Sequence, residues 1–261
     1  MQNEIVLHSI GGPTMVIAVG GLRFMTDPTF DPPGEVMSGS GALLTKTAGP
    51  AMSAEEIGPV DVVLLSHDQH ADNLDDSGRQ FVNTAPLVLT TAGGVERLGG
   101  NSRRLDVWEA IELPRPDGKT ITVTGVPAQH GPDSAVAMLV DVRGFVLAAP
   151  DLPTIYVSGD NASLRVVREI RERLGPIDLA VLFLGAAQVA RIPGANLTLG
   201  SEEGGEAARI LDPARIVPTH FTGWTHFTEG ADDIVRAFRA AGLTDRLTLL
   251  QPGEEARVQT V

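Results

Sequence analysis

The sequence predicts an α/β protein in which layered β-sheets are covered by helices. Strand-like segments dominate the N-terminal part, and strands alternate with helices in the C-terminal part. This order argues against a purely parallel, doubly wound sheet. With 261 residues, 43% of them hydrophobic, the chain can form a sizeable core and suits one large domain or two small ones.

Glycine-rich turns and apolar runs define the expected strands. Glycine pairs at 11–12 and 20–21 separate three short apolar segments, which predicts a meander. The continuous apolar run 60–66 predicts a buried strand. The long aperiodic segment 30–52 is either a functional loop or a disordered connector. The expected strands are residues 4–10, 14–20, 22–28, 60–66, 86–91, 120–130, 135–142, 144–150, 154–160, 177–185, 215–220 and 246–253.

Helix signals lie mainly in the C-terminal part. Apolar residues recur along one face of the segment 161–175. Either Thr198 or Ser201 can cap the following helix, and acidic residues in its first turn suit the helix dipole. The expected helices are residues 92–99, 161–175, 198–211 and 230–242.

Charge and composition exclude several classes of function. The formal net charge of −13 disfavours binding to the phosphate backbone of nucleic acids. The absence of cysteine excludes disulfides, thiolate metal sites and cysteine nucleophiles, and leaves His, Asp, Glu and Asn as metal ligands. No signal peptide or membrane span is recognisable in the sequence, so we expect a soluble cytoplasmic protein that does not bind membranes.

Several of the expected strands end in residue types that bind metals. His67, His70 and Asp72 follow the apolar run 60–66, and the remaining candidates follow three later strands. Strand ends are where a rigid scaffold can direct side chains to one point. Each residue also has a simpler interpretation: a single histidine after a strand is usually a satisfied residue, and the later aspartate can cap a helix. Because four strands each end in such a residue type, we favour one shared site. The candidates after the three later strands are His130, Asp160 and His220.

The segment LLSHDQHADNLD, residues 64–75, resembles the metallo-β-lactamase superfamily signature, His-x-His-x-Asp-His after a buried strand. An isolated His130, the SGD that contains Asp160 and the VPTH that contains His220 follow in the order of that family. The segments MTDPTF and VPTHFTGWTHF look most like the branch containing L-ascorbate-6-phosphate lactonase and related metal-dependent hydrolases. The resemblance covers nearly the whole chain. It implies a single domain, residues 1–261, folded as a four-layer αββα sandwich with two mixed sheets flanked by helices.

The resemblance also implies a metal site at the edge between the two sheets. One cation would be held by His67, His70 and His130. A second would be held by Asp72, Asn73 and His220. Asp160 would bridge the two cations. Asp72 or Asp160 would orient the attacking water or take its proton.

The sequence departs from the family signature at two positions. Gln69 adds a residue between the first two histidines, which would turn one side chain to the other face of an extended segment unless the backbone bulges. Asp68 is therefore an alternative to His67 as the side chain directed at the site. Asn73 stands where the family has a histidine, and an amide oxygen is a weak ligand for zinc. The second metal position would then be weakened, retuned or vacant.

These residues predict a metal-dependent hydrolase that uses metal-activated water on a small molecule, such as a lactone, a phosphorylated sugar acid or a similar ester or amide. The ligands suit Zn²⁺, and they also tolerate Mn²⁺ or Fe²⁺, with one or two ions per chain. The changes at Gln69 and Asn73 leave open an alternative, a degenerate member that binds a ligand or partner without catalysis. A role in nucleic-acid processing is disfavoured by the acidic charge. Related enzymes are often oligomers, so a homo-oligomer also stays open.

Four further residues have open interpretations. His226 either lines the pocket or is a packed or exposed histidine. Trp224 either stacks on a substrate or plugs a turn. Asp27 either accepts a hydrogen bond from a ligating histidine or belongs to an Asp-Pro turn. His8, inside an expected strand, is read as a satisfied histidine, and the segments 30–52 and 186–200 are expected to form the pocket.

Overall fold

The computed structural model describes residues 4–38, 41, 43–134 and 140–259. Its first sheet begins with the expected meander, because the paired glycines let the chain reverse between short antiparallel strands. Three parallel strands extend this meander on one edge, and the C-terminal strand pairs antiparallel with β1 on the other. In spatial order the strands are β15 (Glu255–Gln259), β1 (Glu4–Gly11), β2 (Thr14–Val19), β3 (Leu22–Thr26), β6 (Val62–Leu64), β7 (Leu87–Thr90) and β8 (Ser102–Arg104).

The second sheet is also mixed. Its first four strands in chain order are antiparallel neighbours, and the last two join in parallel after intervening helices. In spatial order they are β14 (Arg215–Thr219), β13 (Leu179–Phe183), β12 (Leu152–Val157), β11 (Val142–Ala149), β10 (Thr120–Ala128) and β9 (Ala110–Pro114).

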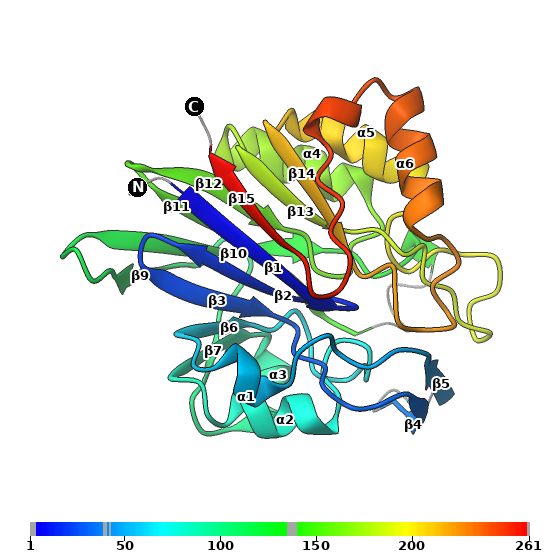
Figure 1. Cartoon of the computed structure of the whole chain (residues 1–261), viewed down its shortest axis with the longest axis horizontal. Coiled ribbons are helices and arrows are strands. Elements are labelled where there is room, and N and C mark those ends of the chain that lie inside the picture. The colour runs from blue at the N-terminus through cyan, green and yellow to red at the C-terminus, as the bar shows by residue number, and fades with distance from the viewer. Residues whose placement is uncertain (1–3, 39–40, 42, 135–139, 260–261) are drawn as a thin grey trace.

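Helices cover the outer face of each sheet, which makes four layers (Figure 1). Side chains of both sheets form the central core, for example Leu7, Phe145 and Val181. One further core lies between each sheet and the helices that cover it. The helices beside the first sheet are α1 (Ala54–Ile57), α2 (Asp76–Val82) and α3 (Ala92–Leu98); those beside the second are α4 (Leu164–Leu174), α5 (Ser201–Leu211) and α6 (Ala231–Ala240), followed by the 3₁₀ turn η2 (Thr244–Arg246). The predicted αββα arrangement is confirmed.

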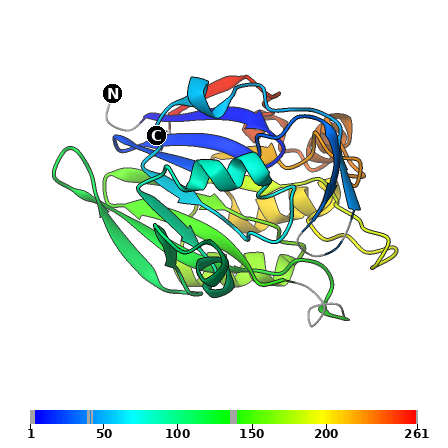
Figure 2. The ribbon, with the colours of Figure 1, turned by 90° about the horizontal axis from the view of Figure 1, so that it is seen from below.

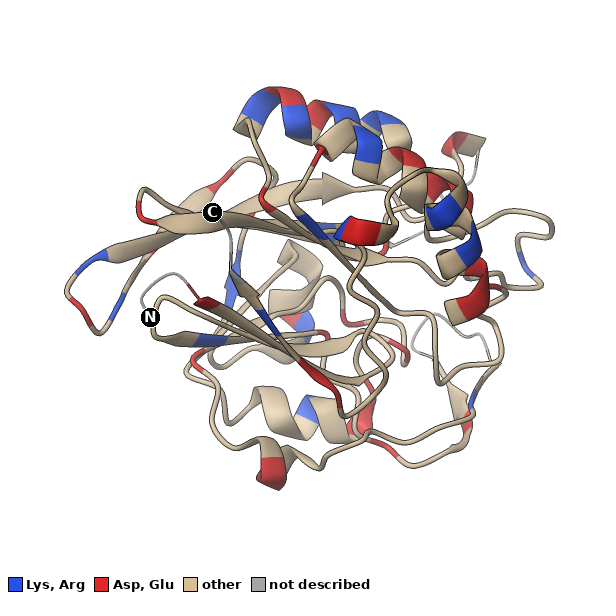
Figure 3. Ribbon diagram, turned by 45° about the horizontal axis from the view of Figure 1, so that its top comes forward, with Lys and Arg blue, Asp and Glu red and all other residues tan. Residues whose placement is uncertain are grey.

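The outer helices show why the sequence forms these layers. In α4, Val166, Val167 and Ile170 are buried against the second sheet, while charged residues face outward. Figure 3 shows basic and acidic residues side by side along these helices, and Arg168 of α4 lies 3.8 Å from Glu206 of α5. Within the described residues, no helix combines the length and apolar character needed to cross a membrane.

Two segments differ from the sequence-based expectation. The segment 30–52 contains a β-hairpin, formed by β4 (Gly34–Met37) and β5 (Leu43–Lys46). The strand predicted at 246–253 is wrong, because Leu250 of that segment packs into the central core and the strand lies further on, in β15. The helices α1 and α2 and the strands β8 and β9 were not expected. Most of the strand predicted at 135–142 lies outside the described residues.

Candidate metal centre

Four strands from the two sheets end at the same edge of the sandwich. In the first sheet, β6 leads into a loop that carries His67, His70 and Asp72. In the second sheet, His130 follows β10, Asp160 follows β12 and His220 follows β14. Residues far apart in the sequence therefore meet at the seam between the sheets, as the strand-end pattern predicts. The six side chains of this polar cluster are His67, His70, Asp72, His130, Asp160 and His220.

Four residues form a first group that could hold a metal ion: His67, His70, His130 and Asp160 have ligand atoms that all lie within 4.8 Å of one another. Nε2 of His67 lies 2.8 Å from Nδ1 of His70. Nδ1 of His130 lies 2.8 Å from the carbonyl oxygen of Leu197, which fixes the ring and leaves Nε2 for a ligand.

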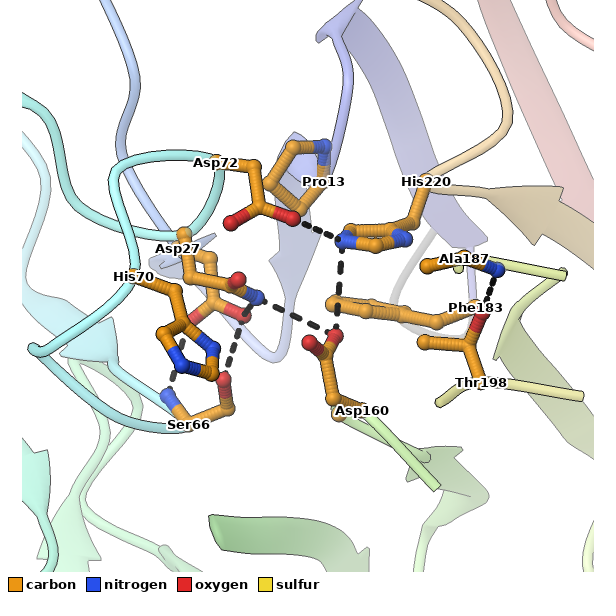
Figure 4. A network of polar contacts seen from close by, with 12 residues as sticks. Pro13, Asp27, Ser66, His70, Asp72, Asp160, Phe183, Ala187, Thr198 and His220 are labelled. Carbon is orange, nitrogen blue, oxygen red and sulfur yellow. Dashed lines mark hydrogen bonds and ion pairs between the residues drawn. The ribbon is translucent and has the colours of Figure 1, made fainter. Parts of the chain in front are cut away.

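A second group with the same property consists of Asp72, Asp160 and His220. Figure 4 shows His220 between the two carboxylates. Its Nε2 lies 3.4 Å from an oxygen of Asp72 and 3.4 Å from an oxygen of Asp160. Because Asp160 belongs to both groups, it stands where a carboxylate could bridge two ions.

The electrostatics of the first group favour neutral imidazoles. Burial, followed by the neighbouring His70, holds the pKa of His67 well below its ordinary value. Burial, followed by His130, lowers the pKa of His70 to about 4. Both rings are therefore neutral near pH 7, which is the form that binds a cation.

The second group combines opposite charges. Burial opposes ionisation of Asp72, but the imidazoles of His226 and His220 outweigh it and hold the pKa of Asp72 well below its usual range. Burial also lowers the pKa of His220, but Asp160 and Asp72 outweigh this effect, so the net shift is upward. Asp72 is therefore an anion at neutral pH and attracts a positive charge to this position.

A series of hydrogen bonds from Asp27 through Ser66 orients the imidazole of His67. Oγ of Ser66 lies 2.9 Å from Nδ1 of His67 and 2.7 Å from Oδ2 of Asp27. With Asp27 accepting from Ser66, the Ser66 oxygen accepts from His67, so the lone pair of His67 Nε2 faces the cluster. Burial raises the pKa of Asp27 to about 7. Asp27 thus contacts the histidine only through Ser66, the residue that directly precedes His67.

Asn73 turns its amide nitrogen towards the carboxylates. Nδ2 donates to Asp27 at 3.1 Å and to Asp160 at 3.2 Å. Since both partners are carboxylate oxygens, the group that faces them must be the NH₂ and not the oxygen. In this orientation the amide nitrogen holds Asp160 in place, while Oδ1 is buried without a hydrogen-bond partner among the described residues. The role of Asn73 as an oxygen ligand stays a prediction.

The loop accommodates the extra residue, Gln69, because the side chain of Asp68 turns away from the cluster. The Asp68 carboxylate accepts two hydrogen bonds of 2.6 Å from Arg97 of α3, and its main-chain oxygen accepts from Arg79 of α2. His67 consequently keeps its place in the first group, and the alternative that Asp68 takes a ligand position is corrected. The sequence contains no local signal for this pairing.

Backbone geometry at two strand ends is tightly constrained. His220 has φ of 60°, a left-handed conformation that is costly for a residue with a β-carbon. Its ring stacks on Phe183 at 5.2 Å. Gly159, directly before Asp160, has φ of 56°, and a β-carbon there would lie 2.6 Å from the carbonyl oxygen of Arg143. Only glycine fits this approach, which explains the SGD sequence.

A pocket of about 460 Å³ opens onto the cluster, with His70, Asp72 and His130 in its wall. Figures 1 and 2 both show the β4–β5 hairpin and the loop around residue 190 at this end of the molecule. The other lining residues are Gly41, Leu43, Leu44, Ala187, Gln188, Val189, Ala190, Arg191, Leu197, Thr225 and His226. Both segments expected to form the pocket contribute to it.

Three remaining histidine and aromatic predictions can be placed. His226 lines the pocket, and its Nε2 lies 2.9 Å from Oδ2 of Asp72. Trp224 is buried with Leu44 and Ala71 and is not among the residues that line this pocket, so it plugs the base of the hairpin. His8 lies within β1, away from the cluster.

The donor set fits a metal cation. Among the described residues, Nε2 of His130, Oδ2 of Asp160 and Nε2 of His220 are buried and have no hydrogen-bond partner. A buried polar atom without a partner costs about 1–3 kcal/mol, so three of them within the two groups favour the binding of a cation there. Imidazole nitrogens and carboxylate oxygens are the donors that Zn²⁺ and related ions take.

Comparison with known proteins agrees with this geometry. Residues 22–221 match the family model of the beta-lactamase superfamily domain. The chain belongs to this superfamily. A UPF0173 metal-dependent hydrolase of Pyrococcus horikoshii is 25% identical over 225 residues, which cover 82% of this chain and 89% of the relative. A second one, of Pelotomaculum thermopropionicum, is 30% identical over 209 residues, with coverage of 77% and 83%.

Solved structures show the same superfamily fold. The crystal structure of an isothiocyanate hydrolase from Delia radicum gut bacteria has a TM-score of 0.79 and 24% sequence identity, and the match covers 96% of this chain and 98% of that one. The predicted superfamily is confirmed. The branch with L-ascorbate-6-phosphate lactonase stays a prediction.

Proposed function

We propose that this member of the superfamily hydrolyses a small molecule with the help of two cations, held by the two ligand groups. The observation that carries the proposal is the convergence of buried, unpartnered donor atoms beside a pocket. His67, His70 and His130 would hold the first cation. Asp72 and His220 would hold the second, and Asp160 would contact both. When bound, such a cation lowers the pKa of water to about 7 and polarises the bond under attack.

The chain's own residues would orient the reactants. Asp160 is fully buried beneath the pocket and is held by Asn73. Its position favours a structural role as a shared ligand, with Asp72 orienting the attacking water.

The pocket suggests a substrate with a compact polar centre and an apolar part. Its volume of about 460 Å³ lies within the range of small-molecule sites. Leu43, Leu44, Val189 and Leu197 supply apolar surface, and the polar residues His70, Asp72 and Thr225 line the same pocket. A lactone, a phosphorylated sugar acid or a related ester or amide fits this description. Isothiocyanates belong in the same panel, because the structurally similar enzyme is named for that activity.

The test is elemental analysis of the purified chain, followed by assays of metal-free and Zn²⁺-, Mn²⁺- or Fe²⁺-loaded protein on this panel. The proposal expects bound metal, turnover that depends on it, and loss of both in a His70→Ala variant. A His8→Ala variant, which changes a histidine outside the cluster, should behave like the unaltered protein. Metal binding without turnover on any substrate would favour a non-catalytic binding role, and absence of bound metal would refute the proposal.

A further inference from the structure

The second ligand group lacks a fourth protein donor. Among the described residues it contains Asp72, Asp160 and His220, whereas Zn²⁺ usually binds four donors. In the observed orientation Asn73 turns its NH₂ group, which has no lone pair, towards Asp160, and its Oδ1 is buried without a hydrogen-bond partner among the described residues. With Asn73 in this orientation, a fourth donor would come from another side chain or from solvent.

His226 approaches this group from the pocket side. Its Nε2 lies 2.9 Å from Oδ2 of Asp72, and Nε2 of His220 lies 3.4 Å from the same oxygen. Two metal bonds of about 2.1 Å separate their donor atoms by ~3.4 Å at a tetrahedral angle and by ~3.0 Å at a right angle. Each imidazole is therefore spaced from Asp72 as two ligands of one cation would be. Nδ1 of His226 is buried and has no partner among the described residues.

The position of His226 is built by two segments of the pocket. The main-chain oxygen of His226 accepts a hydrogen bond of 2.9 Å from the amide of Gln188. On the other side, the amide of Thr225 donates to the carbonyl oxygen of Thr45 in β5 at 3.0 Å. The ring of Phe227 packs on the His226 ring at 4.6 Å. The imidazole is thus held at the inner wall of the pocket and does not extend into solvent.

We propose that His226 is the fourth protein ligand of the second cation, an inference that rests on the proposed metal-dependent function. Two imidazoles and two carboxylates would then form a donor set that zinc accepts. His226 is outside the group whose ligand atoms all lie within 4.8 Å of one another. Its ring must therefore shift from Asp72 towards His220 and Asp160 when the cation binds.

The experiment is a titration of the chelator-treated full chain with Co²⁺, following visible absorption and the number of ions bound per chain. The unaltered protein should bind two equivalents. His226→Ala and His226→Gln should keep the first equivalent and bind the second at least about 100-fold more weakly, since loss of even an indirect ligand contact costs 10- to 100-fold. The control is His8→Ala, which should bind like the unaltered chain.

The glutamine variant separates a ligand from a hydrogen-bond partner. A glutamine amide can still donate to Asp72, so a role limited to that hydrogen bond would leave the second equivalent intact. Two equivalents bound with unchanged affinity by either folded variant, as judged by far-UV circular dichroism, would overturn this inference alone. A single equivalent in the unaltered chain, retained in both variants, would also overturn it. No binding by the unaltered chain would overturn the proposed function together with it.

Discussion

Arg97 forms two hydrogen bonds of 2.6 Å with the carboxylate of Asp68, and this pair accommodates the residue inserted between the two histidines of the motif. The side chain of Asp68 is fully buried, whereas that of Arg97 is 43% exposed. The ion pair therefore fixes the loop that carries His67 and His70 to helix α3. Its contribution is to the geometry of the site, because Asp68 itself points away from the cluster.

Replacing Arg97 with Met should loosen this loop. The buried carboxylate would keep only the weaker contact with Arg79, at 3.9 Å, and we expect a loss of about 1–3 kcal/mol in the free energy of unfolding. Because Arg97 is partly exposed, solvent compensates for part of the loss. The affinity of the chain for Zn²⁺ should fall together with its stability. Arg103→Met, on the exposed edge strand β8, is the control, and equal stability of the two variants in urea unfolding would contradict this account.

Replacing Ser66 with Ala should weaken metal binding without removing a ligand. The change removes the hydroxyl that links Asp27 to Nδ1 of His67 by hydrogen bonds. The imidazole therefore loses the contact that fixes its tautomer. We expect Zn²⁺ affinity to fall about 10- to 100-fold. Calorimetric titration can measure this. Ser77→Ala removes a comparable hydroxyl that binds Asp31, and if both variants lose the same affinity, the orienting role of Ser66 is disproved.

Replacing Gly159 with Ala should disturb Asp160. The added β-carbon would meet the carbonyl oxygen of Arg143 at 2.6 Å, in addition to the cost of a left-handed backbone. We expect a loss of at least about 3 kcal/mol in unfolding free energy. Gly175→Ala has a similar φ of 77° but no atom within 4 Å of the β-carbon, so it should cost only about 1–2 kcal/mol. Thermal denaturation of the pair measures the difference, and equal losses would exclude a steric constraint at the site.

The buried histidines should make the metal-free chain sensitive to acid. The pKa of His70 is about 4 in the folded chain and 6.5 ordinarily, so between these values the unfolded chain binds a proton that the folded chain does not. Stability should therefore fall as the pH drops from 6.5 to 4, by on the order of 3 kcal/mol from His70. Urea unfolding across this range, with and without His70→Gln, measures the slope. An identical slope in both proteins would contradict the shift.

The titration of Asp27 changes the stability of the fold in the opposite direction, and this supplies an internal control. Its pKa is about 7 in the folded chain and 3.8 ordinarily, so between these values the folded chain holds the extra proton. This contribution stabilises the fold at low pH and is lost as the pH rises to 7. An Asp27→Asn variant should thus lose stability more steeply on acidification than the unaltered chain. A shallower dependence would mean that Asp27 is ionised in the folded state.

The sequence was sufficient to predict that the side chains of the polar cluster meet, because strand ends and residue types are local features. His130 and His220 each follow an apolar strand, and parallel or neighbouring strands carry such residues to one edge. The sequence named His226 as one that could line the pocket, but its contact with Asp72 and the pairing of Arg97 with Asp68 could not be predicted, since both contacts depend on the packing of distant segments. The prediction of a strand at 246–253 was wrong for a related reason. Its apolar residues pack into cores, and the pattern does not reveal whether backbone groups pair in a sheet.

The most direct test of the central claim is X-ray diffraction from crystals of the Zn²⁺-loaded chain, recorded on both sides of the zinc absorption edge. We expect two anomalous peaks in each chain. One should lie among His67, His70, His130 and Asp160, and the other among Asp72, Asp160 and His220. Absence of any peak within bonding distance of Asp160, or peaks only at surface carboxylates, would contradict it.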